Sequence, residues 1–504
     1  MRARDAMPNN PLKFEFSGNR RDLPRRLPWA ACVVAVFVFL APNLDFAHAL
    51  PWHDGQRLAQ LGMLLVVTLT LAVPGNAASV ATIWANLPRT IRYALLMAFA
   101  LGVASGFTAA FPRWALLEIG LLLLLVVLGL SIAANRRVLG DRADPLLVLL
   151  FFATAAAYAF TTCSVYVAML LVGPAYGQGF DIRELYTSFS NVRFFGHVQT
   201  MLLPFLLLPV MWWGTTRLRG MLLWSVPAIW WMLAVGSGTR GTWAALLVGV
   251  IAALLFCGNA GRRWAKWQGA GLLCGLLCYG VFVLGIPQLL DLPASFLHRT
   301  EDIVSLSLRE VLWTTAWDYI LQNPWLGVGP MHYAYWATEV AAHPHNAVLQ
   351  WLAEWGVPAG LLLTGVWATG GISLLVHVRR EAEQGDDQSQ LFRVALLAAL
   401  AGASAQAMVD GVLVMPVSQT LLALLAGWSM GMMPAGGGRV AGRGARLILM
   451  PVVLMAASAV AYGVAPEINR LAERQQSYLA ARGPNTILLP RFWTLGWIHI
   501  NHQQ

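Results

Sequence analysis

The stretch ALLEIGLLLLLVVLGLSIAA, residues 115–134, holds one ionisable side chain in 20 positions. About 20 mostly apolar residues form a helix long enough to cross the hydrocarbon core of a bilayer. The whole chain shares this character, since 58% of its 504 residues are hydrophobic and only 12% are charged. A soluble core could not hide so much apolar surface. The sequence therefore predicts an all-α polytopic membrane protein.

Twelve further stretches have a similar length and composition. They cover residues 28–47, 58–76, 93–111, 145–164, 197–214, 220–236, 242–258, 269–287, 358–377, 394–415, 416–433 and 447–464. We therefore expect about 12 to 13 transmembrane helices, which make up a domain over residues 28–464. A basic N-terminal tail, residues 1–27, precedes this domain, and a C-terminal tail, residues 465–504, follows it.

The basic residues give the predicted spans an orientation. Most of the 34 Lys and Arg residues fall in the loops on the same side as the N-terminal tail. Because cytoplasmic loops are the ones enriched in Lys and Arg, we expect that side in the cytoplasm. Two long loops, residues 163–196 and 288–357, then face outward, together with the C-terminal tail. The sequence thus places the working surface of the protein on its outer face.

The charge and the cysteines argue against other classes of protein. The formal charge of +10 suggests a nucleic-acid partner, but the basic residues are scattered between apolar runs instead of gathered on one face. Almost all of the five cysteines lie in apolar stretches, and none is spaced with a histidine like a pair of metal ligands. We expect no nucleic-acid partner, no disulfide framework and no metal site.

Two arginines stand at the predicted outer ends of different helices. Arg193 lies in SNVRFFGH, where His197 follows four residues later and so shares its helical face. Arg240 lies between glycines in the tight turn SGTRGTW. Guanidinium groups form bidentate hydrogen bonds to phosphate oxygens and keep their charge at working pH. If the two helices converge, the arginines suit a pyrophosphate, although Arg193 alone also fits an interfacial anchor.

The second outer loop ends in HPHNAVLQWLAEWGVPAG, residues 343–360. Residues 358–377 already make a complete span, so the helix before them, with its polar residues, is expected outside the membrane. Asn346 is placed to cap the start of that helix. A histidine at a water boundary can act as a general base. His345 and His343 compete for this role, and a capping or structural role for either remains open.

The same loop carries two further features. Arg309, Trp313 and Trp317 recur at four-residue steps and therefore share one face of a helix, which we expect along the membrane interface. Glu354 lies near the C-terminus of the polar helix, where the helix dipole disfavours a carboxylate. We expect Glu354 to meet an arginine or a backbone donor at the break that follows.

These residues resemble the O-antigen ligase and polymerase superfamily. The resemblance spans about residues 183–410. Asp410, at the predicted outer end of the span over 394–415, is similar to an acidic position of the family. The matching motifs are His345, Asn346, Leu349, Gln350, Glu354 and Gly356, then Arg309, Trp313, Asn323, Pro324, Gly327 and Gly329, and the stretches around Arg193 and Arg240.

The resemblance implies a bacterial inner-membrane glycosyltransferase that acts at the periplasmic face and needs neither a metal nor another cofactor. It implies that Arg193 and Arg240 hold the pyrophosphate of an undecaprenyl-pyrophosphate-linked glycan donor, and that His345 activates an acceptor hydroxyl. The remaining candidate site residues are expected to support this reaction; they are Asn346, Arg309, His343, Glu354, His197 and Asp410.

The acceptor remains open at this point. Lipid A-core, the acceptor of an O-antigen ligase, is the first expectation. A glycoprotein such as pilin would instead indicate a protein O-oligosaccharyltransferase, and a growing glycan would indicate an O-antigen polymerase. A lipid or sugar transporter, embedded in the same membrane lipids, is a further alternative, but transporters generally place polar groups near mid-membrane within repeated halves. Here the candidate groups lie at one boundary. A membrane scaffold without chemistry is the last alternative.

Overall fold

The computed structural model describes residues 28–499, apart from 47–48, 74, 177–178, 215, 296–302, 336–339, 382–385, 435–442, 484–485 and 487. Its α-helices are α1 (Trp29–Leu40), α2 (Trp52–Thr70), α3 (Asn76–Asn86), α4 (Arg89–Thr108), α5 (Pro112–Leu139), α6 (Asp144–Leu171), α7 (Val192–Leu206), α8 (Leu208–Trp213), α9 (Arg217–Ser237), α10 (Arg240–Phe256), α11 (Gly258–Cys278), α12 (Ile286–Leu289), α13 (Ile303–Gln322), α14 (Ala347–Trp355), α15 (Val357–Glu381), α16 (Asp387–Ala407), α17 (Pro416–Met432), α18 (Arg443–Val464) and α19 (Leu471–Arg482).

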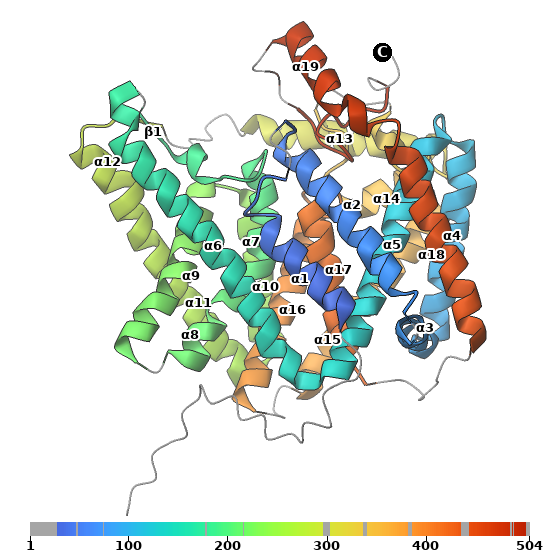
Figure 1. Cartoon of the computed structure of the whole chain (residues 1–504), viewed down its shortest axis with the longest axis horizontal. Helices are drawn as coiled ribbons and strands as arrows, with labels where there is room; N and C mark the ends of the chain where they lie inside the picture. Colours follow the sequence, from blue (N-terminus) through green and yellow to red (C-terminus); the bar gives the residue numbers. More distant parts are fainter. Residues whose placement is uncertain are drawn as a thin grey trace, which may run out of the picture.

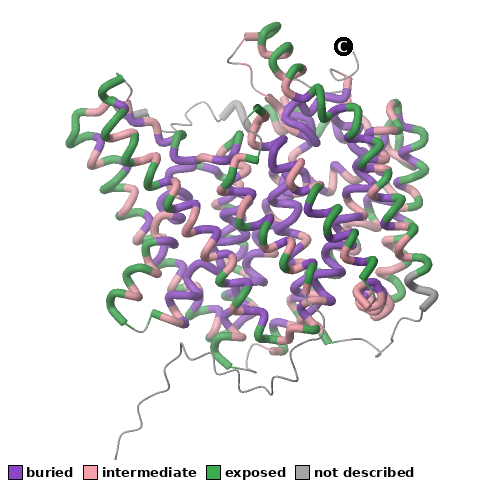
Figure 2. The backbone as a smooth tube through the Cα atoms, in the orientation of Figure 1, coloured by how far each residue is buried: buried purple, intermediate pink, exposed green. Residues whose placement is uncertain are grey.

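The prediction of an all-α polytopic membrane protein is confirmed. Each predicted span overlaps one of these helices, and most of the long helices run side by side as an upright bundle (Figure 1). Among the described residues, eight helical segments are long and apolar enough to cross a membrane, and α1 and α10 are shorter apolar helices. Large apolar side chains such as Phe107, Phe160 and Leu255 are exposed. Exposed positions run along the outermost helices of the bundle (Figure 2). Lipid tails, not water, suit such a surface.

One predicted span ends in the wrong place. The expected helix over 394–415 corresponds to α16, which stops at Ala407. Residues 408–415 form a tight turn instead, in which the backbone N–H of Val414 donates to the carbonyl of Gly411. Asp410 therefore lies in a turn between α16 and α17 and not in a membrane-spanning helix.

Close helix packing holds the centre of the bundle together. The helix that contains residues 115–134, α5, is buried along most of its length and packs against α17 and α18. A methyl group on Gly120 would lie 2.7 Å from the carbonyl oxygen of Ala456. Helices α10 and α16 are packed as closely. A methyl group on Gly249 of α10 would lie 2.7 Å from the carbonyl oxygen of Ala398 in α16. Small residues let helices approach this closely inside a membrane.

The two predicted outer loops meet at one end of the bundle, called the outer face below. Strand β1 (Phe180–Asp181) from the first loop pairs in parallel with β2 (Ala294–Ser295) from the second. Helix α13 lies across this end, at a steep angle to the bundle (Figure 1). It exposes Trp313 and Trp317, as expected for an interfacial helix. Helix α14 lies beneath it and ends at Gly356, whose φ of 82° breaks the chain before α15.

Candidate active site

His345 stands at the centre of the candidate site. It immediately precedes Asn346, the N-cap of α14, and its φ of 52° lies in the left-handed region that non-glycine residues seldom adopt. Its Nδ1 lies 3.4 Å from Oδ1 of Asp410, and 15% of its side chain is exposed. The histidine ring thus faces a carboxylate and remains partly exposed.

Asp410 joins two histidines. Its Oδ2 lies 3.4 Å from Nε2 of the buried His197 in α7, and its Oδ1 accepts a hydrogen bond from the backbone N–H of Gly411 over 2.8 Å. Burial alone would favour the neutral carboxyl, but His197 and His345 outweigh it and hold the pKa of Asp410 well below its ordinary value. Asp410 is therefore a carboxylate that can orient both rings.

Asn346 connects the start of α14, next to His345, to the turn that carries Asp410. Its side-chain oxygen accepts from the backbone N–H of Leu349, which caps α14 as predicted. Its Nδ2 donates to the carbonyl oxygen of Met408 over 3.1 Å. A single side chain thus fixes both the start of α14 and its distance from the 408–415 turn.

His343 is the weaker of the two candidate bases. The residue is 3% exposed, and its ring lies 4.2 Å from the ring of His345, centroid to centroid. Gly411 packs so closely on this ring that an added methyl group would come within 2.5 Å of Cε1. Burial is the main cause that lowers the pKa of His343 well below its ordinary value. His343 therefore packs behind His345, while His345 faces outward.

The two arginine-bearing helix starts converge on Asp410. Helix α7 begins at Val192, and α10 begins at Arg240. A methyl group on Gly241 would lie 3.8 Å from Oδ2 of Asp410, so the first turn of α10 borders the carboxylate. His197, one turn after Arg193, reaches the same carboxylate. Among the described residues, no carboxylate oxygen lies within 4.0 Å of the side chain of Arg193 or Arg240.

Glu354 meets both of its expected kinds of partner. Its carboxylate is fully buried and accepts hydrogen bonds from Arg491 over 2.8 Å and from the backbone N–H of Tyr333 over 3.2 Å. Arg491 also donates to Glu118 of α5 over 2.8 Å. Burial raises the pKa of Glu354; Arg491 opposes this rise, and Glu118 adds to it. Sequence reasoning missed Arg491, whose only signal was an arginine within the aromatic stretch RFWTLGW of the tail.

Arg309 lies on α13. The helix packs on α14 through Leu312 and Ala316, and Tyr333 donates its hydroxyl hydrogen to the carbonyl oxygen of Leu312. The structure therefore places Arg309 with the interfacial helix.

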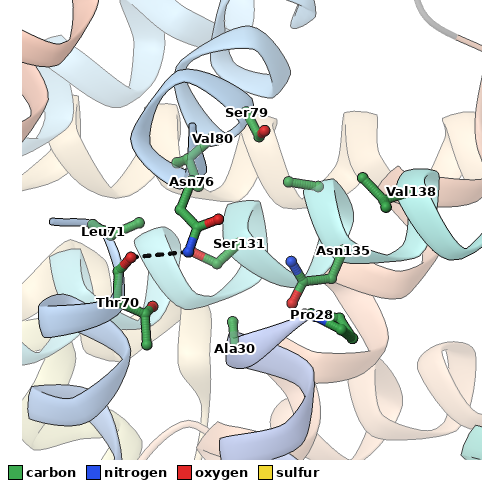
Figure 3. A pocket seen from close by; sticks show the side chains of 11 residues that line it. Pro28, Ala30, Thr70, Leu71, Asn76, Ser79, Val80, Ser131, Asn135 and Val138 are labelled. Carbon is green, nitrogen blue, oxygen red and sulfur yellow. Dashed lines mark hydrogen bonds between the residues drawn. The ribbon is translucent and has the colours of Figure 1, made fainter. Parts of the chain in front are cut away.

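A pocket at the opposite end of the bundle does not form a second candidate site. It lies between α1, α3 and α5, where Asn76 donates to the carbonyl oxygen of Thr70 over 2.9 Å (Figure 3). The described side chains that line it are uncharged. In the part of the chain that the structure describes, no group of three or more His, Cys, Asp or Glu residues is arranged to hold a metal ion.

The fold and the outer cluster define a multi-pass membrane protein with charged and titratable side chains gathered at one boundary. Residues 226–364 match the family model described as O-antigen ligase. This match supports the O-antigen ligase superfamily, whose members are glycosyltransferase-like enzymes. The matched segment contains Arg240, His345 and Glu354, whereas Arg193, His197 and Asp410 lie outside it. No curated protein matches the chain.

Proposed function

We propose that the protein transfers a glycan from an undecaprenyl-pyrophosphate carrier to an acceptor hydroxyl at the periplasmic face of a bacterial inner membrane. The observation that carries this proposal is the placement of His345 and Asp410 beside the arginine-bearing starts of α7 and α10. A base and an anion site then lie at the same boundary. Lipid A-core is the acceptor we expect first, which makes the activity that of an O-antigen ligase.

The geometry suggests how His345 acts. Because Nδ1 faces the Asp410 carboxylate, the Nδ1 proton points toward Asp410 and Nε2 is left to accept a proton. In the proposed step, the acceptor oxygen attacks the anomeric carbon of the glycan and its proton passes to Nε2. The distances of 3.4 Å to Asp410 are long for hydrogen bonds. Such contacts often tighten only when substrate is bound.

Arg193 and Arg240 assist the departure of the pyrophosphate leaving group. As the bond between the anomeric carbon and the carrier breaks, its electron pair goes to the pyrophosphate oxygen and negative charge grows there. Two guanidinium groups and two helix N-termini stabilise that charge. This amount of positive charge suffices to assist departure without a metal ion, which supports the proposed metal independence.

The test is a transfer assay with purified protein. Detergent-solubilised enzyme receives a labelled undecaprenyl-pyrophosphate-linked glycan and, in separate reactions, lipid A-core, pilin, or a second lipid-linked glycan. We expect label on lipid A-core. Label on pilin would instead indicate a protein O-oligosaccharyltransferase, and elongation of the glycan would indicate a polymerase. If no acceptor is labelled while vesicles containing the protein move the lipid-linked glycan across the bilayer, the proposal is wrong and the protein is a transporter.

A further inference from the structure

Eight consecutive residues near the end of the chain, Arg491–Ile498, are all buried at the outer face (Figure 2). They form neither a helix nor a strand and follow the exposed helix α19. Connecting segments usually run over the surface, because buried backbone without regular structure must find other hydrogen-bond partners. The partners of this segment therefore show what it is attached to.

Helix α2 supplies one set of partners through Arg57, which is 1% exposed. Its Nε donates to the carbonyl oxygen of Phe492 over 3.2 Å. Its Nη2 donates to the carbonyl oxygen of Val414, in the turn that carries Asp410. One turn earlier on α2, Asp54 accepts a hydrogen bond from the backbone N–H of Thr494. Arg57 thus joins the C-terminal segment directly to the 408–415 turn.

Arg491 supplies the second attachment. The same Nη2 atom lies 2.8 Å from oxygens of Glu118 and of Glu354, and all three side chains are largely buried. One guanidinium thereby links the tail, the long central helix α5 and the last turn of α14. Removing one partner of such a group would leave a charge buried and unpaired.

The third attachment lies just before the histidines. A methyl group on Gly496 would lie 2.9 Å from Cβ of Ala342, the residue that precedes His343. The backbone N–H of Ile498 donates to the carbonyl oxygen of Ala334. The segment therefore contacts the loop that precedes His345 and, through Arg491, the last turn of α14. Through Arg57 it also reaches the turn that positions Asp410.

We propose that Arg491–Ile498 is a built-in positioning element of the active site and that Arg491 is its principal positioning residue. The segment holds the chain at Ala334, Ala342 and Glu354, together with the 408–415 turn, at the separation in which His345 meets Asp410. Arg491 acts through Glu354 and α14 and does not touch the reacting groups. This proposal rests on the proposed function for its catalytic readout.

The first test compares two shortened proteins in glycan transfer to the identified acceptor. One ends at Pro490 and the other, its control, ends at His499. We expect the protein that ends at Pro490 to insert into the membrane and to lose at least tenfold in kcat, while its Kd for undecaprenyl pyrophosphate stays within twofold, because Arg193 and Arg240 are untouched. The control should match the full chain. Equal kcat values for both proteins would overturn the proposal.

The second test separates charge from packing. Arg491→Met should lower kcat by at least tenfold, and Arg491→Lys should recover part of this loss because an ammonium group still faces Glu118 and Glu354. Arg482→Met, on the exposed helix α19 of the same tail, is the matched control and should have no effect. Equal kcat values for the Met and Lys variants would contradict a positioning role for the Arg491 charge.

Amide hydrogen exchange needs no substrate, so it tests the positioning role of Arg491–Ile498 separately from the proposed function. Amide hydrogen exchange over residues 343–356 should be faster in the protein that ends at Pro490 than in the one that ends at His499, and exchange in α9 and α11 should be unchanged. If the full chain transfers no glycan to any acceptor, the proposed function is wrong, yet this comparison still tests the positioning claim. Unchanged exchange over residues 343–356 would overturn it.

Discussion

At the scale of single residues, the site depends on a histidine in an unfavourable backbone conformation. A non-glycine residue in a sparsely populated region of φ and ψ costs on the order of 1–3 kcal/mol and persists when its surroundings fix it. Asn346 provides much of that restraint next to His345, since it caps α14 and donates to Met408. The strained residue, His345, and the residue that restrains it, Asn346, are thus adjacent in the sequence.

Asn346→Ala should therefore affect activity more than stability. Loss of the cap costs about 1 kcal/mol of unfolding free energy, whereas loss of the Met408 contact lets His345 move relative to Asp410 and should lower kcat by about tenfold or more. Thermal unfolding and glycan transfer measure the two effects. Asp386→Ala removes a comparable cap from the start of α16, far from the site, and is the control. Similar kcat values for both variants would argue against the role assigned to Asn346.

Asp410→Asn keeps the shape of the side chain and removes its charge. An amide neither stabilises the imidazolium that forms during proton transfer nor fixes the Nδ1 tautomer as a carboxylate does. We expect kcat to fall on the order of 100-fold, within the range that general base catalysis contributes, with donor affinity retained. Steady-state kinetics of transfer measure both quantities. Wild-type kcat in this variant would exclude Asp410 from the mechanism.

At the scale of elements, α14 is a short helix fixed at both ends. It has 9 residues, a length at which an isolated helix is marginal in water. Asn346 holds its start, and Glu354 holds its end through Arg491. The sequence predicts this helix correctly because a full span fits after Pro358 and because Asn346 is a favourable cap.

Stability should depend on pH through Glu354. Its pKa is raised by burial, so the folded state binds more protons than the unfolded chain above the ordinary glutamate pKa of 4.5. Unfolding free energy should therefore fall as pH rises from that value toward the raised pKa. Arg491 and Glu118 face the same carboxylate. Melting temperatures of the wild type and of Glu354→Gln between pH 5 and 8 test this, and the variant should show the flatter profile. Parallel profiles would contradict the assignment.

The end of α16 shows where local reasoning fails. Val412–Met415 are apolar, so hydropathy extends the predicted span through residue 415. In the structure, the helix ends at Ala407, and one of the carbonyl groups left free, that of Met408, accepts a hydrogen bond from Asn346. Asn346 is distant from Met408 in the sequence, and no local sequence pattern predicts this contact.

At the scale of the whole molecule, the sequence predicts the spans because apolar length is a local property, and it predicts candidate residues because they interrupt that pattern at one boundary. It does not predict that His197 and His345 share Asp410, since this depends on how α7, α10 and α16 pack. The sequence does not predict the contacts of the C-terminal segment Arg491–Ile498 either, because its partners lie on α2, α5 and α14.

The convergence of α7 and α10 makes a prediction about the donor. Arg193→Lys and Arg240→Lys should each weaken binding of undecaprenyl pyrophosphate by about tenfold, since a charged hydrogen bond contributes about 1.5–3 kcal/mol and lysine loses the planar fork. Binding is measured on purified protein by calorimetry. Arg219→Lys, at the far end of α9, is the control. Wild-type affinity in both site variants would separate these arginines from the pyrophosphate.

The proposed function depends most on His345, the proposed base of glycan transfer at the outer face. The most direct measurement is the rate of transfer from labelled undecaprenyl-pyrophosphate-linked glycan by His345→Ala, alongside His377→Ala, whose histidine lies toward the inner end of α15. We predict that His345→Ala inserts into the membrane and binds the donor with wild-type affinity but transfers no glycan, while His377→Ala retains activity. Transfer by His345→Ala at the wild-type rate would exclude His345 as the base.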